Sequence, residues 1–239
     1  SVKSAPLPRL LRQLRIRVVN VPEALTDAVA EHTLGLMLLL AKKFIKYDKA
    51  VRSGNWKIRY KAENIELKGK ILGLIGFGKI GRTVANLAQA LGVQVLVYDP
   101  YVKNELPNIK HVELDALLQK ADFLSVHCPL TKETWHFLGK NELEKMKRTA
   151  YIINTARGGI IDEKVLCRLI RIGRLAGAAL DTTEEEPLSP ENPILSCPNI
   201  IFTAHTAGLT KEAMQRISFL AAKQILQVLR GEVPKYVLV

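Results

Sequence analysis

The chain has 239 residues, of which 48% are hydrophobic and 24% charged, so it is long enough to bury a full globular core. Its longest apolar run, Leu34 to Ala41, is too short to span a bilayer, and no secretory signal is evident at the N-terminus. The net charge of +12 is spread over scattered basic clusters, which favours solvated protein faces over a nucleic-acid-binding surface.

The three cysteines, Cys128, Cys167 and Cys197, show neither paired nor metal-type spacing. Such cysteines are typical of reduced thiols in a cytoplasmic protein. No His/Cys/Asp cluster has the spacing of a metal site either. We therefore expect a cytoplasmic protein without a bound metal.

The N-terminal third begins with a basic, proline-broken stretch over residues 1–14 that ends in a short helical pattern. Ile16 to Asn20 reads as a brief buried strand, and Asn55 to Lys68 as a loop. Between them, one unusually long helix is predicted from Ala28 to about Ser53. Because its Leu34 to Leu40 part is apolar on more than one side, it needs another surface, from this chain or from a second subunit.

A glycine-rich turn follows at residues 76–81, in the form G-x-G-x-x-G. An apolar run (Lys70 to Ile75) precedes it, a helical pattern (Arg82 to Leu91) follows it, and a second apolar run (Gln94 to Tyr98) ends in an aspartate. Alone the glycine pattern is weak, because many α/β turns match it. A strand, glycine turn, helix, strand and acid in this order indicate a dinucleotide site.

Each residue of this motif has its own physical reason. Gly76 would allow the tight turn, Gly78 would let the backbone approach a pyrophosphate, and Gly81 would let the helix pack closely on the strand. The helix N-terminus offers unpaired N–H groups to the anion. Asp99 would accept hydrogen bonds from ribose hydroxyls and repel a 2′-phosphate. The motif therefore favours NAD over NADP.

Short strands and helices continue to alternate along the rest of the chain, which predicts a doubly wound parallel sheet covered on both faces. Ligands of such sheets bind outside the carboxyl ends of the strands. The remaining predicted strands are 121–127, 150–155, 175–181 and 199–203, and the remaining predicted helices are 113–120, 140–147, 162–172 and 211–230.

Three late strands run into groups that could carry chemistry at this edge. They lead to Arg157, to the run Glu184 to Glu186, and to His205. An arginine can bind a carboxylate through two hydrogen bonds. A histidine can exchange a proton with a hydroxyl oxygen, and a carboxylate can orient the imidazole. This combination suits the reduction of a carbonyl group.

Several segments together resemble the D-isomer-specific 2-hydroxyacid dehydrogenases, the NAD-linked family that includes glyoxylate/hydroxypyruvate reductases, D-lactate dehydrogenases and phosphoglycerate dehydrogenases. From about Arg15 to the end, the chain keeps the family's order and spacing. Besides the glycine turn, the matching segments are Asn20 to Pro22, Ala30 to Thr33, His127 to Thr131, Asn154 to Gly159, Gly177 to Asp181, Glu185 to Pro187 and His205 to Gly208.

The resemblance assigns roles residue by residue. It implies that Arg157 binds and polarises a 2-oxo acid, Glu186 supports the histidine, and His205 is the acid/base. The choice of Glu186 among the three glutamates depends on this family match. The resemblance also implies that Asp181 contacts the nicotinamide amide. For His127, cofactor contact and simple strand termination stay open. Further cofactor contacts are expected from Lys79, Ile80, Pro100, Pro129, Thr155, Ala156 and Gly208.

The resemblance also implies a two-lobed organisation. We expect an NAD-binding domain over residues 22–206, and only part of a flavodoxin-like substrate lobe in residues 1–21 and 207–239. The expected function is hydride transfer between NAD(H) and a small 2-hydroxy or 2-oxo acid, in a homodimer formed through the helix at 28–53. The alternative is a non-catalytic NAD(H)-binding dimerisation module, similar to the family's corepressors.

Overall fold

The computed structural model describes residues 10–11, 13–14, 16–102 and 109–238. Residues 1–9, 12 and 15, which belong to the predicted N-terminal part of the second lobe, lie outside the described residues. The chain divides into two compact units, Val29–Ala207 and Ser1–Ala28 together with Gly208–Val239.

The larger unit is built on one seven-stranded sheet in the order β3-β2-β1-β4-β5-β6-β7, and every neighbouring pair of strands is parallel. The order reverses between β1 and β4, which is the switch point at which such sheets bind ligands. The predicted doubly wound parallel sheet is therefore confirmed. The strands are β1 (Ile71–Ile75), β2 (Gln94–Tyr98), β3 (Ile109–His111), β4 (Phe123–Val126), β5 (Tyr151–Asn154), β6 (Gly177–Leu180) and β7 (Ile200–Phe202).

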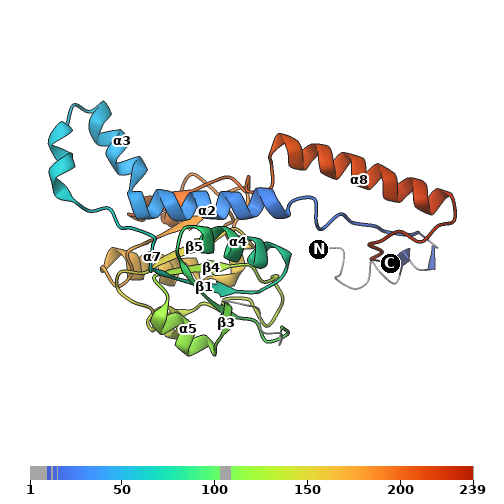
Figure 1. Ribbon diagram of the computed structural model, residues 1–239, viewed down its shortest axis with the longest axis horizontal. Helices are drawn as coiled ribbons and strands as arrows, with labels where there is room; N and C mark the ends of the chain where they lie inside the picture. Colours follow the sequence, from blue (N-terminus) through green and yellow to red (C-terminus); the bar gives the residue numbers. More distant parts are fainter. Residues whose placement is uncertain (1–9, 12, 15, 103–108, 239) are drawn as a thin grey trace. The chain divides into compact units, whose positions relative to one another are not determined.

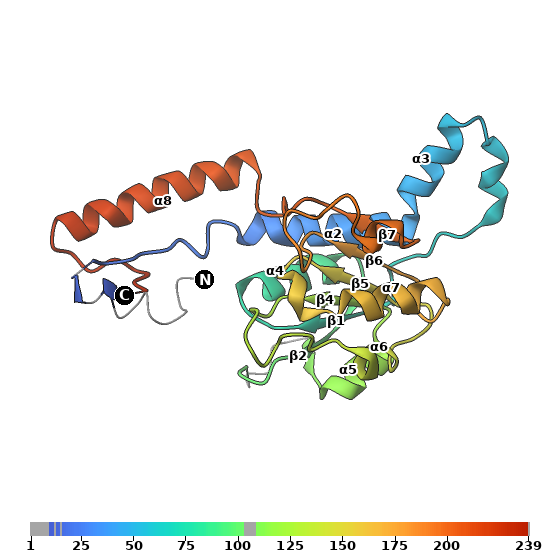
Figure 2. The same cartoon turned by 180° about the vertical axis from the view of Figure 1, so that it is seen from behind.

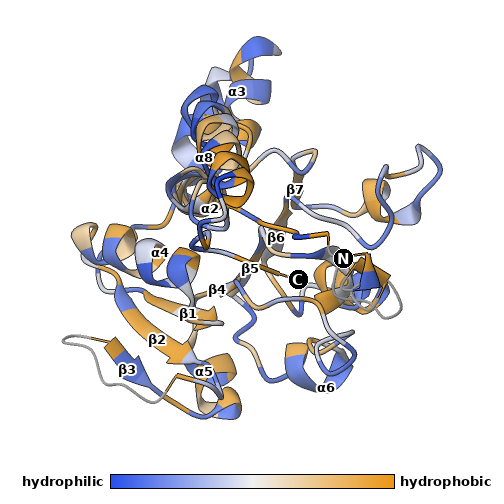
Figure 3. Cartoon of the chain, turned by 90° about the vertical axis from the view of Figure 1, so that its right-hand side faces the viewer, coloured by the Kyte–Doolittle hydropathy of each residue, from blue (hydrophilic) through white to orange (hydrophobic). Residues whose placement is uncertain are grey.

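Helices cover both faces of the sheet, because consecutive strand residues point to opposite sides and both sides are apolar. In β5, Ile153 packs with α2 and α4, whereas Ile152 packs with α5, α6 and α7. Figures 1 and 2 show α2 and α4 across the sheet from α5, and Figure 3 shows β1 and β2 coloured largely as hydrophobic. The helices are α2 (Thr26–Lys42), α4 (Lys79–Ala90), α5 (Leu114–Lys120), α6 (Lys140–Leu143) and α7 (Glu163–Arg171).

The prediction of one helix from 28 to 53 is wrong, because the chain bends at Lys43. This residue has φ 51° and ψ 36°, in the left-handed region, and separates α2 from α3 (Phe44–Arg52). α3 buries none of its residues and extends away from the sheet (Figure 1). A lysine is an uncommon residue for this conformation, so the sequence offers no signal for the break.

Other predicted bounds also change. The expected loop at 55–68 contains the 3₁₀ helix η1 (Trp56–Lys61), and the helix predicted to end at Lys147 ends at Leu143. The short edge strand β3 was not predicted, since its three residues carry too little apolar pattern. Two further 3₁₀ helices are η2 (Gly158–Ile160) and η3 (Pro193–Ser196).

The smaller unit contains α8 (Lys211–Leu229) and the chain segments beside it. The strand predicted at 16–20 is wrong: within it, only Val19 pairs, through an isolated antiparallel bridge to Val237. Gln224 of α8 is buried and bonds to the chain on both sides of this bridge. Its amide donates to the Asn20 carbonyl (2.6 Å) and accepts from the Tyr236 N–H (3.2 Å).

Candidate active site

The glycine turn connects β1 to α4, and two of its glycines are required by close contacts. Gly76 has φ +93°, and a Cβ on it would lie 2.7 Å from the backbone nitrogen of Cys128. A Cβ on Gly81 would lie 2.5 Å from the carbonyl oxygen of Gly76. No side chain of L-configuration fits at either position without moving backbone atoms.

Gly78 differs, because a Cβ there would meet no atom of the protein within 4 Å. It precedes α4, and no side chain caps the helix N-terminus at this residue. The turn therefore leaves open space in front of a helix N-terminus whose N–H groups can bind an anion. This shape fits the pyrophosphate of a dinucleotide.

Asp99 follows β2 and supports the same turn. Its Oδ2 accepts a hydrogen bond from the Phe77 N–H (2.7 Å), and its Oδ1 accepts one from the Tyr101 N–H (2.9 Å). Each carboxylate oxygen can still accept a second hydrogen bond. Asp99 thus joins the strand end to the glycine turn and remains suited to ribose hydroxyls.

The end of β4 faces the glycine turn and carries His127 and Cys128. Burial lowers the pKa of His127 to about 4, so its imidazole is neutral near pH 7, and its Nε2 lies 2.9 Å from the Ser125 hydroxyl. Burial, the largest cause, raises the pKa of the Cys128 thiol to about 11. Neither group is therefore charged at neutral pH.

The turn after β5 carries Arg157, and the buried side chain of Asn154 fixes its shape. The Asn154 amide donates to the Arg157 carbonyl (2.9 Å) and accepts from the Ala156 N–H (3.0 Å). Arg157 itself is exposed, and its guanidinium donates to the Ala156 carbonyl (2.6 Å). Sequence reasoning missed Asn154, although a polar residue at the end of an apolar strand is a signal for such a role.

Glu186 and His205 form the closest pair among the predicted catalytic residues. Glu186 Oε2 lies 2.8 Å from His205 Nδ1, and Glu186 Oε1 accepts from the Thr183 N–H (3.2 Å). The His205 side chain is 48% exposed and that of Glu186 is 40% exposed, so substrate could reach them. His205 has φ +55°, a strained conformation that is more frequent at functional sites.

Asp181, at the end of β6, holds the segment that carries the histidine. It is 2% exposed, and its oxygens accept from the Thr203 hydroxyl (2.5 Å) and from the N–H groups of Thr206 (2.9 Å) and Ala207 (3.0 Å). Its carbonyl accepts from the His205 N–H (2.8 Å). The carboxylate that the resemblance assigns to the nicotinamide amide is thus used within the protein to shape the His205 turn.

α2 also contacts the ends of β5, β6 and β7 through side chains that the sequence did not single out as site residues. His32 Nε2 lies 3.1 Å from the Thr203 hydroxyl and 3.6 Å from Asp181 Oδ1. Thr33, which is buried, bonds through its hydroxyl to Thr155 (2.9 Å). The next polar layer behind the predicted site therefore comes from a helix that sequence reasoning assigned to packing.

The strand ends place these groups along one edge of the sheet. Arg157, Glu186 and His205 follow β5, β6 and β7, which are neighbours, while the glycine turn and Asp99 follow β1 and β2. Among the described residues, no hydrogen bond or ion pair joins Arg157 to Glu186 or His205. The edge therefore offers a hydrogen-bonded carboxylate–imidazole pair and a separate, exposed guanidinium beside a nucleotide-shaped turn.

Two other kinds of feature are absent from the part of the chain that the structure describes. No cluster of three or more His, Cys, Asp or Glu side chains has the arrangement of a metal site. No helix in that part has the length and apolar character needed to cross a membrane.

Comparison with known proteins gives the family. The model of the "D-isomer specific 2-hydroxyacid dehydrogenase, NAD binding domain" matches residues 34–207. A glyoxylate reductase of Thermofilum pendens is 43% identical over 226 residues, which are 92% of this chain and 67% of that protein. A D-3-phosphoglycerate dehydrogenase of Archaeoglobus fulgidus is 43% identical over 222 residues, 92% of this chain and 42% of that protein.

Solved structures agree with this match. The crystal structure of the TT0316 protein from Thermus thermophilus has a TM-score of 0.91 and 36% identity, covering 97% of this chain and 74% of that one. The chain thus spans between about two fifths and three quarters of these three proteins. With its NAD-binding domain over most of its length, this chain belongs to the D-isomer specific 2-hydroxyacid dehydrogenases, a family of NAD-dependent oxidoreductases.

Proposed function

We propose that this chain carries the hydride-transfer site of a dehydrogenase that interconverts small 2-oxo and 2-hydroxy acids of the D series. The observation that supports it most is the 2.8 Å hydrogen bond between Glu186 and His205, beside a turn shaped for a dinucleotide. A site that only bound NAD would have no use for a carboxylate–imidazole pair. The names of the relatives, glyoxylate reductase and phosphoglycerate dehydrogenase, agree with such substrates.

Different residues of this chain would bind the cofactor, bind the substrate and transfer the proton. The turn at Gly76–Gly81 would hold the pyrophosphate and Asp99 the ribose; the bound nicotinamide would supply or accept a hydride at its C4 atom. Arg157 would bind the substrate carboxylate and polarise the carbonyl. His205 would donate a proton to the carbonyl oxygen during reduction and remove it during oxidation. Glu186 accepts from His205 Nδ1, which leaves Nε2 for the proton transfer.

The remaining cofactor contacts also belong to this proposal. Lys79 and Ile80 open α4, Pro100 and Pro129 follow the ends of β2 and β4, and these positions adjoin the dinucleotide turn. Others from the sequence-based set are His127, Thr155, Ala156, Asp181 and Gly208. Gly208 begins the second segment of the smaller unit, where a Cβ would lie 3.2 Å from Leu25.

We also propose that the smaller unit is part of a substrate lobe. Its helix α8 exposes several large apolar side chains, which need covering: Met214, Phe219, Ile225, Leu226 and Leu229. Substrate choice would then depend on polypeptide that packs against them.

A homodimer is proposed as well, through the α2–α3 region. α3 buries nothing, and the segment after it exposes Trp56 (64%) and Tyr60 (79%). Aromatic side chains of this kind are enriched in protein interfaces. Light scattering at micromolar concentration tests the dimer, and a monomeric mass would contradict it.

A cytoplasmic location is also proposed. Cys167 and Cys197 are buried and form no disulfide, which fits a reducing compartment.

The proposal is tested by replacing the acid/base. We expect His205→Ala to reduce glyoxylate or hydroxypyruvate about 10²–10⁴-fold more slowly, measured by loss of NADH absorbance. The matched control is Lys110→Ala on the exposed edge strand β3, which should keep the parent rate. A His205→Ala protein that reduced these acids at the parent rate would contradict the assignment of His205 as the acid/base.

A non-catalytic NAD(H)-binding dimerisation module is the second candidate, because the family model that matches residues 34–207 is that of an NAD-binding domain. The two candidates differ in one measurement. NADH that is bound but not oxidised with any of several 2-oxo acids supports the module, whereas oxidation excludes it.

A further inference from the structure

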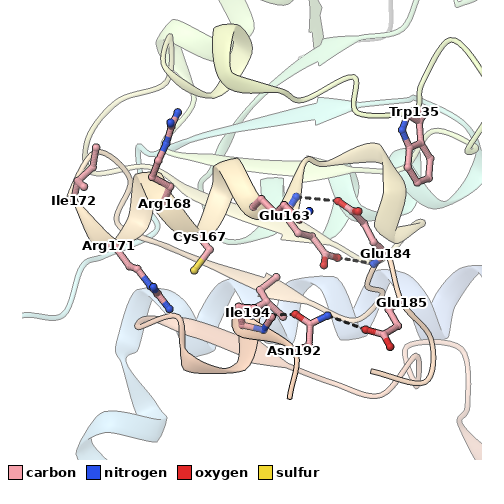
Figure 4. A pocket seen from close by; sticks show the side chains of 12 residues that line it. Trp135, Glu163, Cys167, Arg168, Arg171, Ile172, Glu184, Glu185, Asn192 and Ile194 are labelled. Carbon is pink, nitrogen blue, oxygen red and sulfur yellow. Dashed lines mark hydrogen bonds between the residues drawn. The ribbon is translucent and has the colours of Figure 1, made fainter. Parts of the chain in front are cut away.

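A cavity of about 670 Å³ lies behind the segment that carries Glu186, on the side of α7 and η3 (Figure 4). Three glutamates of its wall belong to neither the cofactor turn nor the catalytic pair, and two of these, Glu163 and Glu184, bond to each other. Glu163 is the first residue of α7, and Glu184 lies two residues before Glu186. The cavity is also lined by the cations Lys164, Arg168 and Arg171.

These two glutamates hold each other by a reciprocal pair of hydrogen bonds, drawn as dashed lines in Figure 4. Glu163 Oε1 accepts from the Glu184 N–H (2.7 Å), and Glu184 Oε1 accepts from the Glu163 N–H (3.0 Å). Glu163 is 7% exposed. The helix N-terminus of α7 is therefore tied directly to the backbone of the segment that carries Glu186.

His136 extends this contact to the Arg157 turn. Its Nε2 lies 3.0 Å from Glu184 Oε1, and its backbone N–H donates to the Gly159 carbonyl (2.7 Å). Its ring stacks on Trp135, with the centroids 4.6 Å apart. The same small cluster thus contacts the segments that carry both Arg157 and Glu186.

The glycines after Arg157 confirm how closely these segments pack. A Cβ on Gly158 would lie 1.9 Å from the carbonyl carbon of Thr183, and one on Gly159 would lie 2.2 Å from the ring of Trp135. The Arg157 turn is therefore enclosed between Trp135 on one side and the Thr183–Glu184 backbone on the other. A displacement of Glu184 would move both catalytic segments.

We propose that Glu163 is a positioning residue, which through its bond to the Glu184 N–H fixes the segment that aims Glu186 at His205. The proposal depends on the function proposed above for Glu186 and His205. Glu163 would touch neither substrate nor cofactor. Its role is to keep a carboxyl oxygen at the Glu184 N–H.

The charges around Glu163 make this role independent of a full negative charge. Burial raises the pKa of Glu163 to about 7, opposed by the Glu184 N–H and helped by the charges of Glu184, Glu186 and Asp162. Across Glu184 lies His136, whose Nδ1 is 3.8 Å from Asp162 Oδ2. Because the acid is partly protonated near neutral pH, an uncharged amide of the same shape should replace it.

Three variants separate the position of the side-chain oxygen at residue 163 from its negative charge. Glu163→Gln keeps an oxygen for the Glu184 N–H; Glu163→Asp keeps the charge but withdraws the oxygen by one methylene; Glu163→Leu removes the oxygen. We expect Glu163→Gln to keep kcat within about twofold, and the other two to lower it about tenfold or more, since a displacement of about 1 Å can cost 10²-fold. The dissociation constant of NADH should stay unchanged, because β4 and β5 separate the glycine turn from the Glu184 segment. Glu113→Gln, Glu113→Asp and Glu113→Leu, at the exposed N-cap of α5, are the matched controls.

A second readout needs no turnover. The His205 Nδ1–H proton, bonded to Glu186, should give an NMR signal that persists in Glu163→Gln and moves or disappears in Glu163→Asp and Glu163→Leu. The inference would be overturned if Glu163→Asp and Glu163→Leu kept the kcat and the His205 signal of the parent protein. It would also be overturned if Glu163→Gln lost both while Glu163→Asp retained them. If Leu fails to fold, the Gln–Asp comparison decides. A parent protein without reductase activity whose His205 signal still responds would reject the proposed function but keep the positioning role.

Discussion

The glycine turn and the catalytic segments occupy the same edge of one sheet but are held in place by different forces. At the glycine turn, Gly76 and Gly81 are required because any side chain would collide with backbone atoms. At the catalytic segments, Asn154 and Asp181 shape the turns through directed hydrogen bonds from buried polar side chains. One region is defined by space and the other by polar contacts.

This difference has a practical consequence for mutation and pH. A steric requirement does not change with pH, and a single methyl group can violate it. A polar requirement fails when a donor loses its acceptor, and the stability it gives changes with pH when a carboxyl titrates.

The largest effect is expected at Gly81. In Gly81→Ala the new Cβ would lie 2.5 Å from the Gly76 carbonyl oxygen, so we expect a loss of about 3 kcal/mol in stability and at least 100-fold weaker NADH binding. Gly78→Ala is the control, since its Cβ meets open space: the melting temperature should stay unchanged while NADH affinity falls. Equal melting temperatures for both variants would contradict the steric account.

Asp181→Asn should be nearly as costly on the catalytic side. The amide places an N–H₂ group against donors that now reach a carboxylate, so about 2–3 kcal/mol of stability is expected to be lost. Because these donors hold the His205 turn, kcat should fall together with stability. Urea unfolding and single-turnover kinetics measure the two effects, and an unchanged kcat would separate Asp181 from the turn.

The Glu163 carboxyl should give a pH dependence of stability. With a pKa of about 7 in the folded protein and 4.5 when unfolded, the folded state binds more protons between these values. The free energy of unfolding should therefore fall as pH rises from 4.5 to 7, by at most about 3 kcal/mol. Glu163→Gln lacks this slope, so the difference between variant and parent should grow over that range.

His127 acts in the opposite direction in the parent protein. Its pKa is lowered from 6.5 to about 4, so its contribution to stability is lost as pH falls through this range. The two slopes offset each other near pH 5–6, which is why the comparison of Glu163→Gln with the parent is needed. A difference between them that does not vary with pH would refute the assigned Glu163 titration.

The smallest effect is expected for cofactor choice. Asp99→Asn keeps an oxygen for the Phe77 N–H but removes the negative charge that would face a 2′-phosphate. We expect the affinity ratio of NADPH to NADH to rise about tenfold, the equivalent of roughly 1.4 kcal/mol. Fluorescence titration with both cofactors measures the ratio, and an unchanged value would place the ribose elsewhere.

The sequence alone predicts the features that depend on local pattern. The glycine turn, the strands predicted at 70–75, 94–98 and 121–127, and their parallel direction follow from residues that are neighbours in the chain. The structure has these strands at 71–75, 94–98 and 123–126. Lys43 shows the limit: its left-handed conformation ends α2 although the helical pattern continues through it. Tertiary contacts decide such a break, and periodicity does not contain them.

The candidate site divides in the same way. Arg157 and His205 could be selected because each follows a strand, whereas Glu186 was selected among three glutamates by the family match. The catalytic roles of all three stay predictions. The contacts among Glu163, Glu184 and His136 could not be predicted, since they join residues 21 and 48 positions apart across separate turns. Nor does the sequence reveal that Asp181 uses its oxygens to hold the turn that carries His205.

The position of β7 has a consequence for how the site opens. β7 is a three-residue strand at the edge of the sheet and, within the described part of the chain, pairs only with β6, whereas β1 pairs on both sides with β2 and β4. Backbone amides near the acid/base should therefore exchange with deuterium sooner than those under the glycine turn. On heating, the segment that carries His205 should therefore unfold locally before the glycine turn does. Catalysis would then be lost at a temperature at which the glycine turn still binds the dinucleotide.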